Sequence, residues 1–193
     1  KISMNERSFV WKPLRDLVIP GYLECMWVHG IKLPVSKKIY ITWSEIESRC
    51  KSICDQIKDS INVSTIIGVS RGGLIPATLF AKELNVREVL SFGVKSYPEE
   101  GDYENRIHEP IIYQDINTCA PQLFRGDDIL IVDDVSDKGN TFKFITNYLL
   151  QMQPSMNLYT SSLYIKEDTS FKPHWWGNTL NDWIVFPWER YKS

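Results

Sequence analysis

A run of four aliphatic residues, Ile129 to Val132, passes directly into a cluster of acidic residues. A strand with apolar side chains on both faces is typical of the centre of a parallel sheet that helices cover on both sides. Similar short apolar strands alternate along the chain with segments of helical spacing. This alternation predicts an α/β fold with a central, mostly parallel sheet flanked by helices.

The periodicity also predicts where the main elements lie. We expect helices at 43–59, 74–84 and 141–152, and strands at 39–41, 65–69, 89–96, 129–132 and 158–165. The first helix should begin with a capping box, because Thr42 precedes Glu45 by three residues. Residues 97–127 are polar with little periodicity except around 111–113, and a loop of this length in a compact domain is typically functional or disordered. We expect it to act as a lid.

Residues 1–36 differ from the rest of the chain. They are rich in Trp, Pro and Gly, and only 28–35 is expected to hold a short strand. We interpret them as an N-terminal extension to one domain at 37–193. The aromatic residues of this extension favour packing on the domain or on a neighbouring subunit.

The charge and cysteine content narrow the class of protein. The 22 basic and 24 acidic side chains nearly balance, which argues against binding to nucleic acid or to an anionic membrane. The four cysteines form no CxxC pair, so we expect free thiols in a reducing compartment. Cys50 and Cys54 lie one helical turn apart, which favours packing over metal binding. With no signal-peptide pattern and no membrane-spanning apolar run, we expect a cytoplasmic protein.

Two acids follow the 129–132 strand, at the edge where ligands bind in open α/β sheets. Successive side chains of a strand diverge, so Asp133 and Asp134 can address the two hydroxyls of a ribose, directly or through a divalent cation. Alternatively, the pair belongs to an acidic turn before a helix, with Asp137 in solvent.

The next residues have the composition of a phosphate-binding loop. Gly139 permits a tight turn, and the amides of Lys138, Gly139, Asn140 and Thr141 converge at the start of the expected helix. Converging amides, the helix dipole and the Thr141 hydroxyl favour a phosphate monoester. Lys138 either adds positive charge to this site or points into solvent.

A second polar turn follows the 65–69 strand. It consists of Ser70, Arg71, Gly72 and Gly73. The two glycines let the backbone approach a ligand closely, and Arg71 offers a forked donor to phosphate oxygens. Taken alone, an Arg-Gly-Gly segment is more often just an ordinary turn.

Together these segments resemble the type I phosphoribosyltransferases. Their signature is an apolar strand followed by Asp-Asp, two residues and Asp-Thr-Gly-x-Thr, and here Lys138 replaces the first Thr. The resemblance extends over residues 37–190 and is greatest to the xanthine-guanine type of purine phosphoribosyltransferase. In that type a Lys donates to the purine 6-oxo group, a Trp stacks on the base, and the next residue's carbonyl meets the edge of the base.

By position, these base-binding roles fall on Lys166, Trp183 and Ile184. An aromatic ring that stacks on a flat base contributes about 1–3 kcal/mol. The alternative is that Trp183 forms an ordinary hydrophobic cluster with Phe186 and Trp188.

The resemblance also implies a function. It implies a type I phosphoribosyltransferase fold with a small C-terminal hood, and transfer of ribose 5-phosphate from phosphoribosyl pyrophosphate (PRPP) to guanine, xanthine or hypoxanthine in purine salvage. Asp133 and Asp134 would bind the ribose and Mg²⁺, and Ser70 to Gly73 would bind pyrophosphate. Asp137 would take the proton of the purine imidazole ring. Relatives of this kind are usually homodimers or homotetramers.

Two other functions stay open. One is a phosphoribosyltransferase for a different acceptor, although Lys166 favours a 6-oxopurine because an ammonium group can only donate hydrogen bonds. The other is a regulatory protein of the same fold that senses PRPP or nucleotides and binds RNA or a protein. The balanced charge and the presence of Asp137 favour the enzyme.

Overall fold

The computed structural model describes residues 25–28, 31–34, 37–95, 110–116 and 128–190. The chain divides into two compact units, residues 1–37 and 38–193. In the first unit, strands β1 (Cys25–Val28) and β2 (Ile31–Pro34) form an antiparallel pair. Strand β2 confirms the short strand expected within 28–35, whereas β1 was not predicted. The rest of the predicted N-terminal extension lies outside the described residues.

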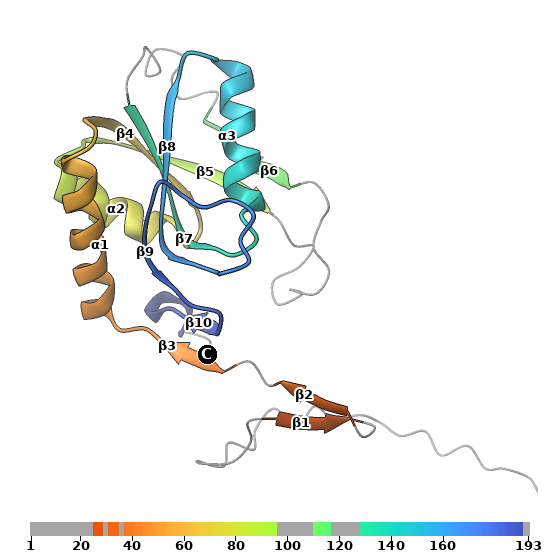
Figure 1. Ribbon diagram of the computed structural model, residues 1–193. Helices are drawn as coiled ribbons and strands as arrows, with labels where there is room; N and C mark the ends of the chain where they lie inside the picture. Colours follow the sequence, from red (N-terminus) through yellow and green to blue (C-terminus); the bar gives the residue numbers. More distant parts are fainter. Residues whose placement is uncertain (1–24, 29–30, 35–36, 96–109, 117–127, 191–193) are drawn as a thin grey trace, which may run out of the picture. The chain divides into compact units, whose positions relative to one another are not determined.

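Six strands form the central sheet of the second unit, in the order β6-β5-β4-β7-β8-β9 (Figure 1). These strands are β4 (Val63–Ser70), β5 (Glu88–Lys95), β6 (Ile111–Gln114), β7 (Asp128–Ser136), β8 (Asn157–Ile165) and β9 (Trp175–Thr179). Every neighbouring pair is parallel except β5 and β6. The predicted mostly parallel sheet is confirmed.

Helices cover both faces of this sheet, as the apolar strands require. Helices α1 (Trp43–Lys58) and α2 (Leu74–Leu84) lie on one face, and α3 (Asn140–Met152) lies on the other (Figure 1). Ile66 belongs to the core cluster that includes α1 and α2, whereas its neighbour Ile67 packs in the cluster with α3. Successive residues of a strand thus point to opposite faces of the sheet and pack in two separate hydrophobic cores.

Part of the C-terminal region forms strands that the periodicity did not predict. These are β9 and β10 (Trp183–Val185), followed by a short 3-10 helix, η1 (Pro187–Glu189). Strand β10 pairs in parallel with β3 (Lys38–Tyr40) as a separate two-stranded sheet. Strand β10 has three residues, too few for a readable period, and its pairing depends on β3, which is distant in the sequence.

The two cysteines of α1 are part of the hydrophobic core. Cys50 and Cys54 are both buried, alongside Ile46, Ile53 and Ile57 on the same helix face. Burial raises the pKa of the Cys50 thiol to about 12, so this group stays neutral. The predicted packing role is confirmed. Within the ranges that the structure describes, no helix is long and apolar enough to cross a membrane.

Only residues 110–116 of the expected 97–127 loop are described. They include strand β6, which pairs with β5, and Ile116, which is buried in the core with α3. This part is therefore ordered at the sheet edge. The predicted lid otherwise lies outside the described residues.

The start of α1 offers a direct test of the local fold. The Thr42 backbone nitrogen and hydroxyl both donate to the Glu45 carboxylate at 2.7 Å, and the Glu45 nitrogen donates to the Thr42 hydroxyl at 3.2 Å. Because Thr42→Ala removes this cap, we expect the free energy of unfolding in urea to fall by about 1 kcal/mol. Ser44→Ala, an exposed change in the same turn, should alter it by less than about 0.5 kcal/mol. Equal losses in the two variants would contradict the capping role.

Candidate active site

The predicted polar segments meet at the carboxyl ends of β4, β7 and β8. Ser70 ends β4, the two acids lie near the end of β7, and Lys166 follows β8 directly. These three strands are neighbours in the sheet and run parallel to one another. Their carboxyl ends therefore form one edge, which is where ligands bind in open α/β sheets.

The two acids lie within β7 and not after it, which corrects the predicted end of this strand at residue 132. The pairing of β7 with β4 ends at Val132, whereas its pairing with β8 continues to Ser136. The Asp134 nitrogen donates to an Asp133 carboxylate oxygen at 2.9 Å, and the Val135 nitrogen donates to Asp134 at 2.8 Å. Asp133 and Asp134 thus lie just beyond the last β7 residue that pairs with β4, while β4 itself stays paired with β5 up to Ser70.

The Ser70 to Gly73 turn packs directly against these acids. A Cβ atom added at Gly72 would lie 1.8 Å from an Asp134 carboxylate oxygen, and one at Gly73 would lie 2.5 Å from the Val132 carbonyl oxygen. A side chain at Gly72 would displace the Asp134 carboxylate, and one at Gly73 would require the backbone to move. The sequence predicted a close approach to a ligand, and the structure shows a close approach to the protein's own β7.

The surroundings of the acids disfavour their ionised forms. Burial, and then the Asp134 charge, raise the pKa of Asp133 well above its usual value. Burial, and then the Glu189 carboxylate, raise the pKa of Asp134 to about 6. Two adjacent carboxylates held partly out of water are typical of a site that receives a cation or hydroxyl groups.

The predicted phosphate loop joins β7 to α3. Gly139 has a φ of 79°, a left-handed conformation that favours glycine, and it begins α3. Among the described residues, no side chain caps this helix start. The loop is held from behind, because the Ser170 nitrogen and hydroxyl donate to the Lys138 carbonyl oxygen at 3.1 and 2.7 Å. A helix start without a side-chain cap is a suitable place for a phosphate.

Lys138, which departs from the family signature, has a specific partner. Its ammonium group forms an ion pair with Asp168. The hydrogen bond from Lys138 is the main cause that lowers the pKa of Asp168. Sequence reasoning missed Asp168, although an acid two residues after Lys166 was a signal that the extra charge at Lys138 had a counterpart.

One cavity of about 380 Å³ lies at this edge of the sheet. Its lining residues, all polar or charged, are Asp137, Lys138, Lys166, Glu167, Asp168 and Asn181. The structure therefore brings the predicted proton acceptor and the predicted base-binding lysine to the same pocket. Burial lowers the pKa of Lys166, and the nearby Asp137 charge opposes that shift.

The segment around Trp183 is tied to the same pocket through a backbone contact. The Lys166 ammonium group donates to the carbonyl oxygen of Asp182, the residue before Trp183. Trp183 is 38% exposed, which leaves ring surface for a ligand, whereas the Ile184 side chain is buried in the core. Phe186 and Trp188 stack on each other with ring centres 4.5 Å apart, so the hydrophobic-cluster interpretation holds for these two rings.

The other predicted residues do not line this cavity. They are Ser70, Arg71, Gly72, Gly73, Asp133, Asp134, Gly139, Asn140, Thr141, Trp183 and Ile184. The structure places them at the neighbouring strand ends, at the start of α3 and on β10. Asn181 lines the cavity but was not predicted as a site residue. Its side-chain oxygen accepts from the Glu167 nitrogen at 3.1 Å and so joins the segment after β8 to the segment before β10.

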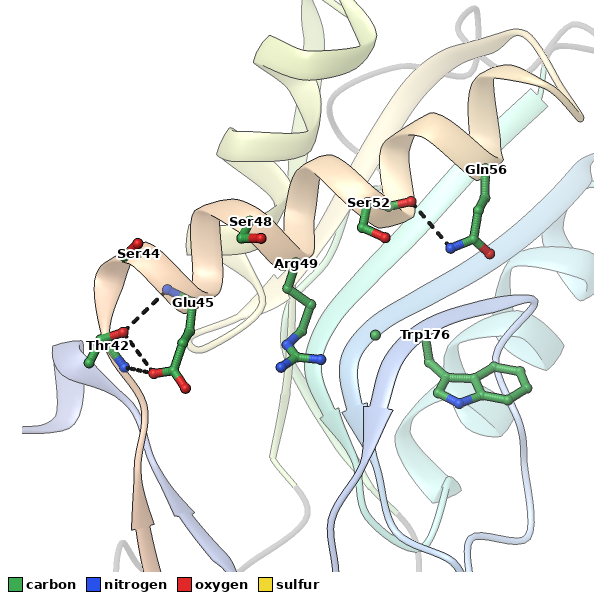
Figure 2. Close-up of a pocket in the computed structure, with 9 residues that line it drawn as sticks. Thr42, Ser44, Glu45, Ser48, Arg49, Ser52, Gln56 and Trp176 are labelled. Carbon is green, nitrogen blue, oxygen red and sulfur yellow. Dashed lines mark hydrogen bonds between the residues drawn. The ribbon is translucent and has the colours of Figure 1, made fainter.

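A second cavity, of about 490 Å³, lies between α1 and β9 (Figure 2). None of the predicted site residues lines it. Several of its polar groups are engaged within α1, such as Thr42 with Glu45 and the Gln56 amide with the Ser52 carbonyl. The Arg49 guanidinium lies 4.5 Å from the centre of the Tyr164 ring. This cavity is not part of the site at the strand ends.

The amino-acid sequence of this unit matches a known family. The family model that describes the phosphoribosyl transferase domain matches residues 39–191 of this chain. The chain belongs to that family. The predicted resemblance to the type I phosphoribosyltransferases and the predicted fold class are confirmed.

Relatives and solved structures agree with this assignment. A xanthine-guanine phosphoribosyltransferase from Idiomarina loihiensis is 27% identical over 154 residues, which are 80% of this chain and 88% of that protein. The crystal structure of a purine phosphoribosyltransferase from Pyrococcus horikoshii Ot3 is similar with a TM-score of 0.64 at 27% identity, over 81% of this chain and 96% of that one. The Helicobacter pylori xanthine-guanine-hypoxanthine phosphoribosyltransferase shares the fold, with a TM-score of 0.67 at 22% identity, over 80% of this chain and 95% of that one.

The raised pKa of Asp134 predicts a pH-dependent effect on stability. A carboxyl group whose pKa rises to about 6 on folding destabilises the ligand-free protein as the pH increases from about 4 to about 6. Because Asp134→Asn keeps an acceptor oxygen without the charge, we expect it to stabilise the protein by about 1–2 kcal/mol above about pH 7. The gain should disappear near pH 4, about the pKa of an unfolded Asp. Urea unfolding of the wild type and of Asp134→Asn across this pH range measures the gain in stability and its loss at low pH.

Asp55→Asn is a matched control, since this exposed carboxylate pairs with Lys58 on the surface of α1. It should give no comparable gain. A gain for Asp134→Asn that is the same at every pH would show that charge at this position is not the cause.

Proposed function

We propose that this phosphoribosyltransferase transfers ribose 5-phosphate from PRPP to a 6-oxopurine, guanine, xanthine or hypoxanthine, in purine salvage. The observation that carries the proposal is the shared pocket of Asp137 and Lys166, beside the start of α3. It would place a proton acceptor and a donor to an exocyclic oxygen around one base. The purine specificity in the names of the relatives supports the same substrate class.

The ribose 5-phosphate would bind at the β7–α3 junction. The phosphate would lie at the start of α3, against the amides of Lys138 to Thr141 and the Thr141 hydroxyl. Asp133 and Asp134 would accept hydrogen bonds from the ribose hydroxyls. Lys138 forms an ion pair with Asp168, and it would add positive charge near the phosphate by exchanging this anionic partner for the phosphate.

The pyrophosphate group would bind at the turn that packs on Asp134. Arg71 would supply a forked donor, and the Gly72 and Gly73 amides would supply hydrogen bonds that need no side chain. Because Gly72 contacts Asp134, the pyrophosphate and ribose subsites are adjacent. This adjacency suits a substrate in which the two groups share one bond.

The acids also fit a magnesium ion that arrives with PRPP. Within the described residues, no group of three His, Cys, Asp or Glu side chains forms a preformed metal site. Magnesium is commonly held by one or two carboxylates together with waters and substrate phosphates. Asp133 and Asp134 would be those carboxylates, because a cation offsets the cost of ionising them. When bound, the ion would neutralise charge on the departing pyrophosphate.

The base would lie between the Lys166 pocket and Trp183. Lys166 would donate to the 6-oxo group, and the partly exposed Trp183 ring would stack on the purine. The Val185 carbonyl oxygen accepts from the Ile41 nitrogen, so β3 lies on the side of β10 to which this carbonyl points. Alternate carbonyls of a strand point to opposite edges. The Ile184 carbonyl is therefore directed away from β3, which suits its proposed contact with the base.

The reaction needs little covalent chemistry from the protein. A purine ring nitrogen forms a bond to C1′ of the ribose while the C1′–oxygen bond to pyrophosphate breaks, through a state of oxocarbenium character. Asp137 would accept the proton that the imidazole ring loses. The protein holds the reactants in line and stabilises the leaving group, which is where most of the rate enhancement arises in such transfers.

We place the protein in the cytoplasm as a homodimer or homotetramer, without a nucleic-acid or membrane partner. The buried, neutral thiol of Cys50 fits a reducing compartment. The formal net charge of -2 supports small-molecule substrates over nucleic acid. Light scattering of the purified protein tests the oligomeric state.

An absorbance assay tests the proposed function. With PRPP and Mg²⁺, we expect the protein to consume guanine, xanthine or hypoxanthine, and to leave adenine unchanged because Lys166 cannot accept from an amino group. Lys166→Met should raise the KM for the base by about tenfold or more, since an unpaired 6-oxo group is costly to bury. Lys172→Met, an exposed lysine in the following loop, is the matched control. PRPP binding without consumption of any 6-oxopurine would instead indicate a regulatory protein.

Asp137 can be tested separately from binding. Asp137→Asn should lower kcat by about 10²- to 10⁴-fold, because general-base catalysis typically contributes this much. The Kd for PRPP, measured by calorimetry with Mg²⁺, should change by less than about twofold, since Asp137 acts on the base. Asp59→Asn at the end of α1 should alter neither quantity. Unchanged turnover in Asp137→Asn would remove this residue from the general-base role.

A further inference from the structure

A small polar network joins strand β6 to the turn after β4. The Tyr113 hydroxyl donates to the Ser70 carbonyl oxygen at 3.3 Å, and the Ser70 and Ser91 hydroxyls lie 2.6 Å apart. Ser91 in turn donates to the Gln114 side-chain oxygen at 3.2 Å. Because a serine hydroxyl has one proton, Ser70 is the donor to Ser91. The carbonyl and the hydroxyl of Ser70 are thus held from β6 and β5 respectively.

The backbone of β6 is shaped for this contact. Gly93 of β5 pairs with Gln114, and Val94 pairs with Ile112, which leaves Tyr113 as the extra residue of a bulge. The Tyr113 ring lies directly over Gly93, where an added Cβ would be 2.5 Å from a ring carbon. Gly93 is also the partner of Ser70 in the β4–β5 pairing. The ring therefore crosses β5 at its glycine and reaches the end of β4.

The contact controls the orientation of one peptide group. The carbonyl of Ser70 and the N–H of Arg71 belong to the same planar unit. A hydrogen bond to the Ser70 carbonyl therefore also limits the direction of the Arg71 N–H. This amide begins the turn to which we assigned the pyrophosphate, and on its other side the turn is packed against Asp134 through Gly72. The turn is held between β6 and β7.

We propose that Tyr113 and Gln114 are positioning residues for the pyrophosphate-binding turn and act through Ser70. The proposal rests on the proposed function of that turn. The network contains only neutral groups, so it adds no charge to the site and contributes through geometry alone. Its loss should weaken the binding of the pyrophosphate group and leave the base subsite unchanged, because Lys166 and Trp183 lie on other elements.

The test is Tyr113→Phe, which removes the hydroxyl and keeps the ring over Gly93. We expect the KM for PRPP and the Kd for magnesium pyrophosphate to rise about three- to tenfold, the range for one neutral hydrogen bond. The KM for the base and kcat should stay within about twofold of the wild-type values. Tyr159→Phe is the matched control, since Tyr159 lies near the start of β8, at the opposite end of the sheet from Ser70.

Two further variants keep the test independent of one substitution. Gly93→Ala should reproduce the effect by displacing the Tyr113 ring, and Ser91→Ala should reproduce part of it by removing the partner of the Ser70 hydroxyl. Thermal melting checks that each variant is folded. A general structural defect would alter the base KM and kcat as well.

The outcomes separate this inference from the proposed function. An active wild type with unchanged PRPP and pyrophosphate affinities in folded Tyr113→Phe would overturn only the positioning role. A wild type that binds pyrophosphate but consumes no 6-oxopurine would overturn the proposed function, while weaker pyrophosphate binding in Tyr113→Phe would still support positioning. A wild type that binds neither PRPP nor pyrophosphate would overturn both.

Discussion

The contact between the Gly72 backbone and the Asp134 carboxylate sets the arrangement of the whole site. It exists because β4 and β7 are adjacent parallel strands, about 4.8 Å apart, and because the turn after β4 folds back over the end of β7. A methyl group at Gly72 would occupy the position of the carboxylate oxygen. The proposed pyrophosphate and ribose subsites are therefore adjacent, and the distance between them follows from the spacing between neighbouring strands of the sheet.

Burial and neighbouring carboxylates also make the ionised forms of the two acids unfavourable. Two acids that are shielded from water, and close to each other and to Glu189, have raised pKa values and are costly to ionise. A bound cation or ribose hydroxyls would offset that cost. The site thus holds its polar groups in place before the ligand arrives, at some expense of stability, as is common where function requires preorganised charge.

The elements that the sequence predicted well are those with a long periodic pattern. Helix α2 has the predicted bounds, and α1 begins with the predicted capping box. The end of β7 was placed too early because two acids usually end a strand, whereas here the pairing with β8 continues past them. Strand β10 was missed because it has three residues and depends on β3 for its hydrogen bonds. Asp168 was missed because its partner, Lys138, is distant in sequence.

The amino-acid sequence by itself determined the chemical groups of the candidate site and their order along the chain: the Arg-Gly-Gly turn, the acids before the Gly139 loop, the lysine after a strand and the tryptophan downstream of it. Local periodicity and turn chemistry are sufficient for that. Only the tertiary structure decided that Asp137 and Lys166 line one pocket, that Lys166 contacts the segment before Trp183, and that β6 holds Ser70. Such contacts depend on which strands are neighbours and in what register they pair. That choice is made by packing of the whole sheet, and no local pattern encodes it.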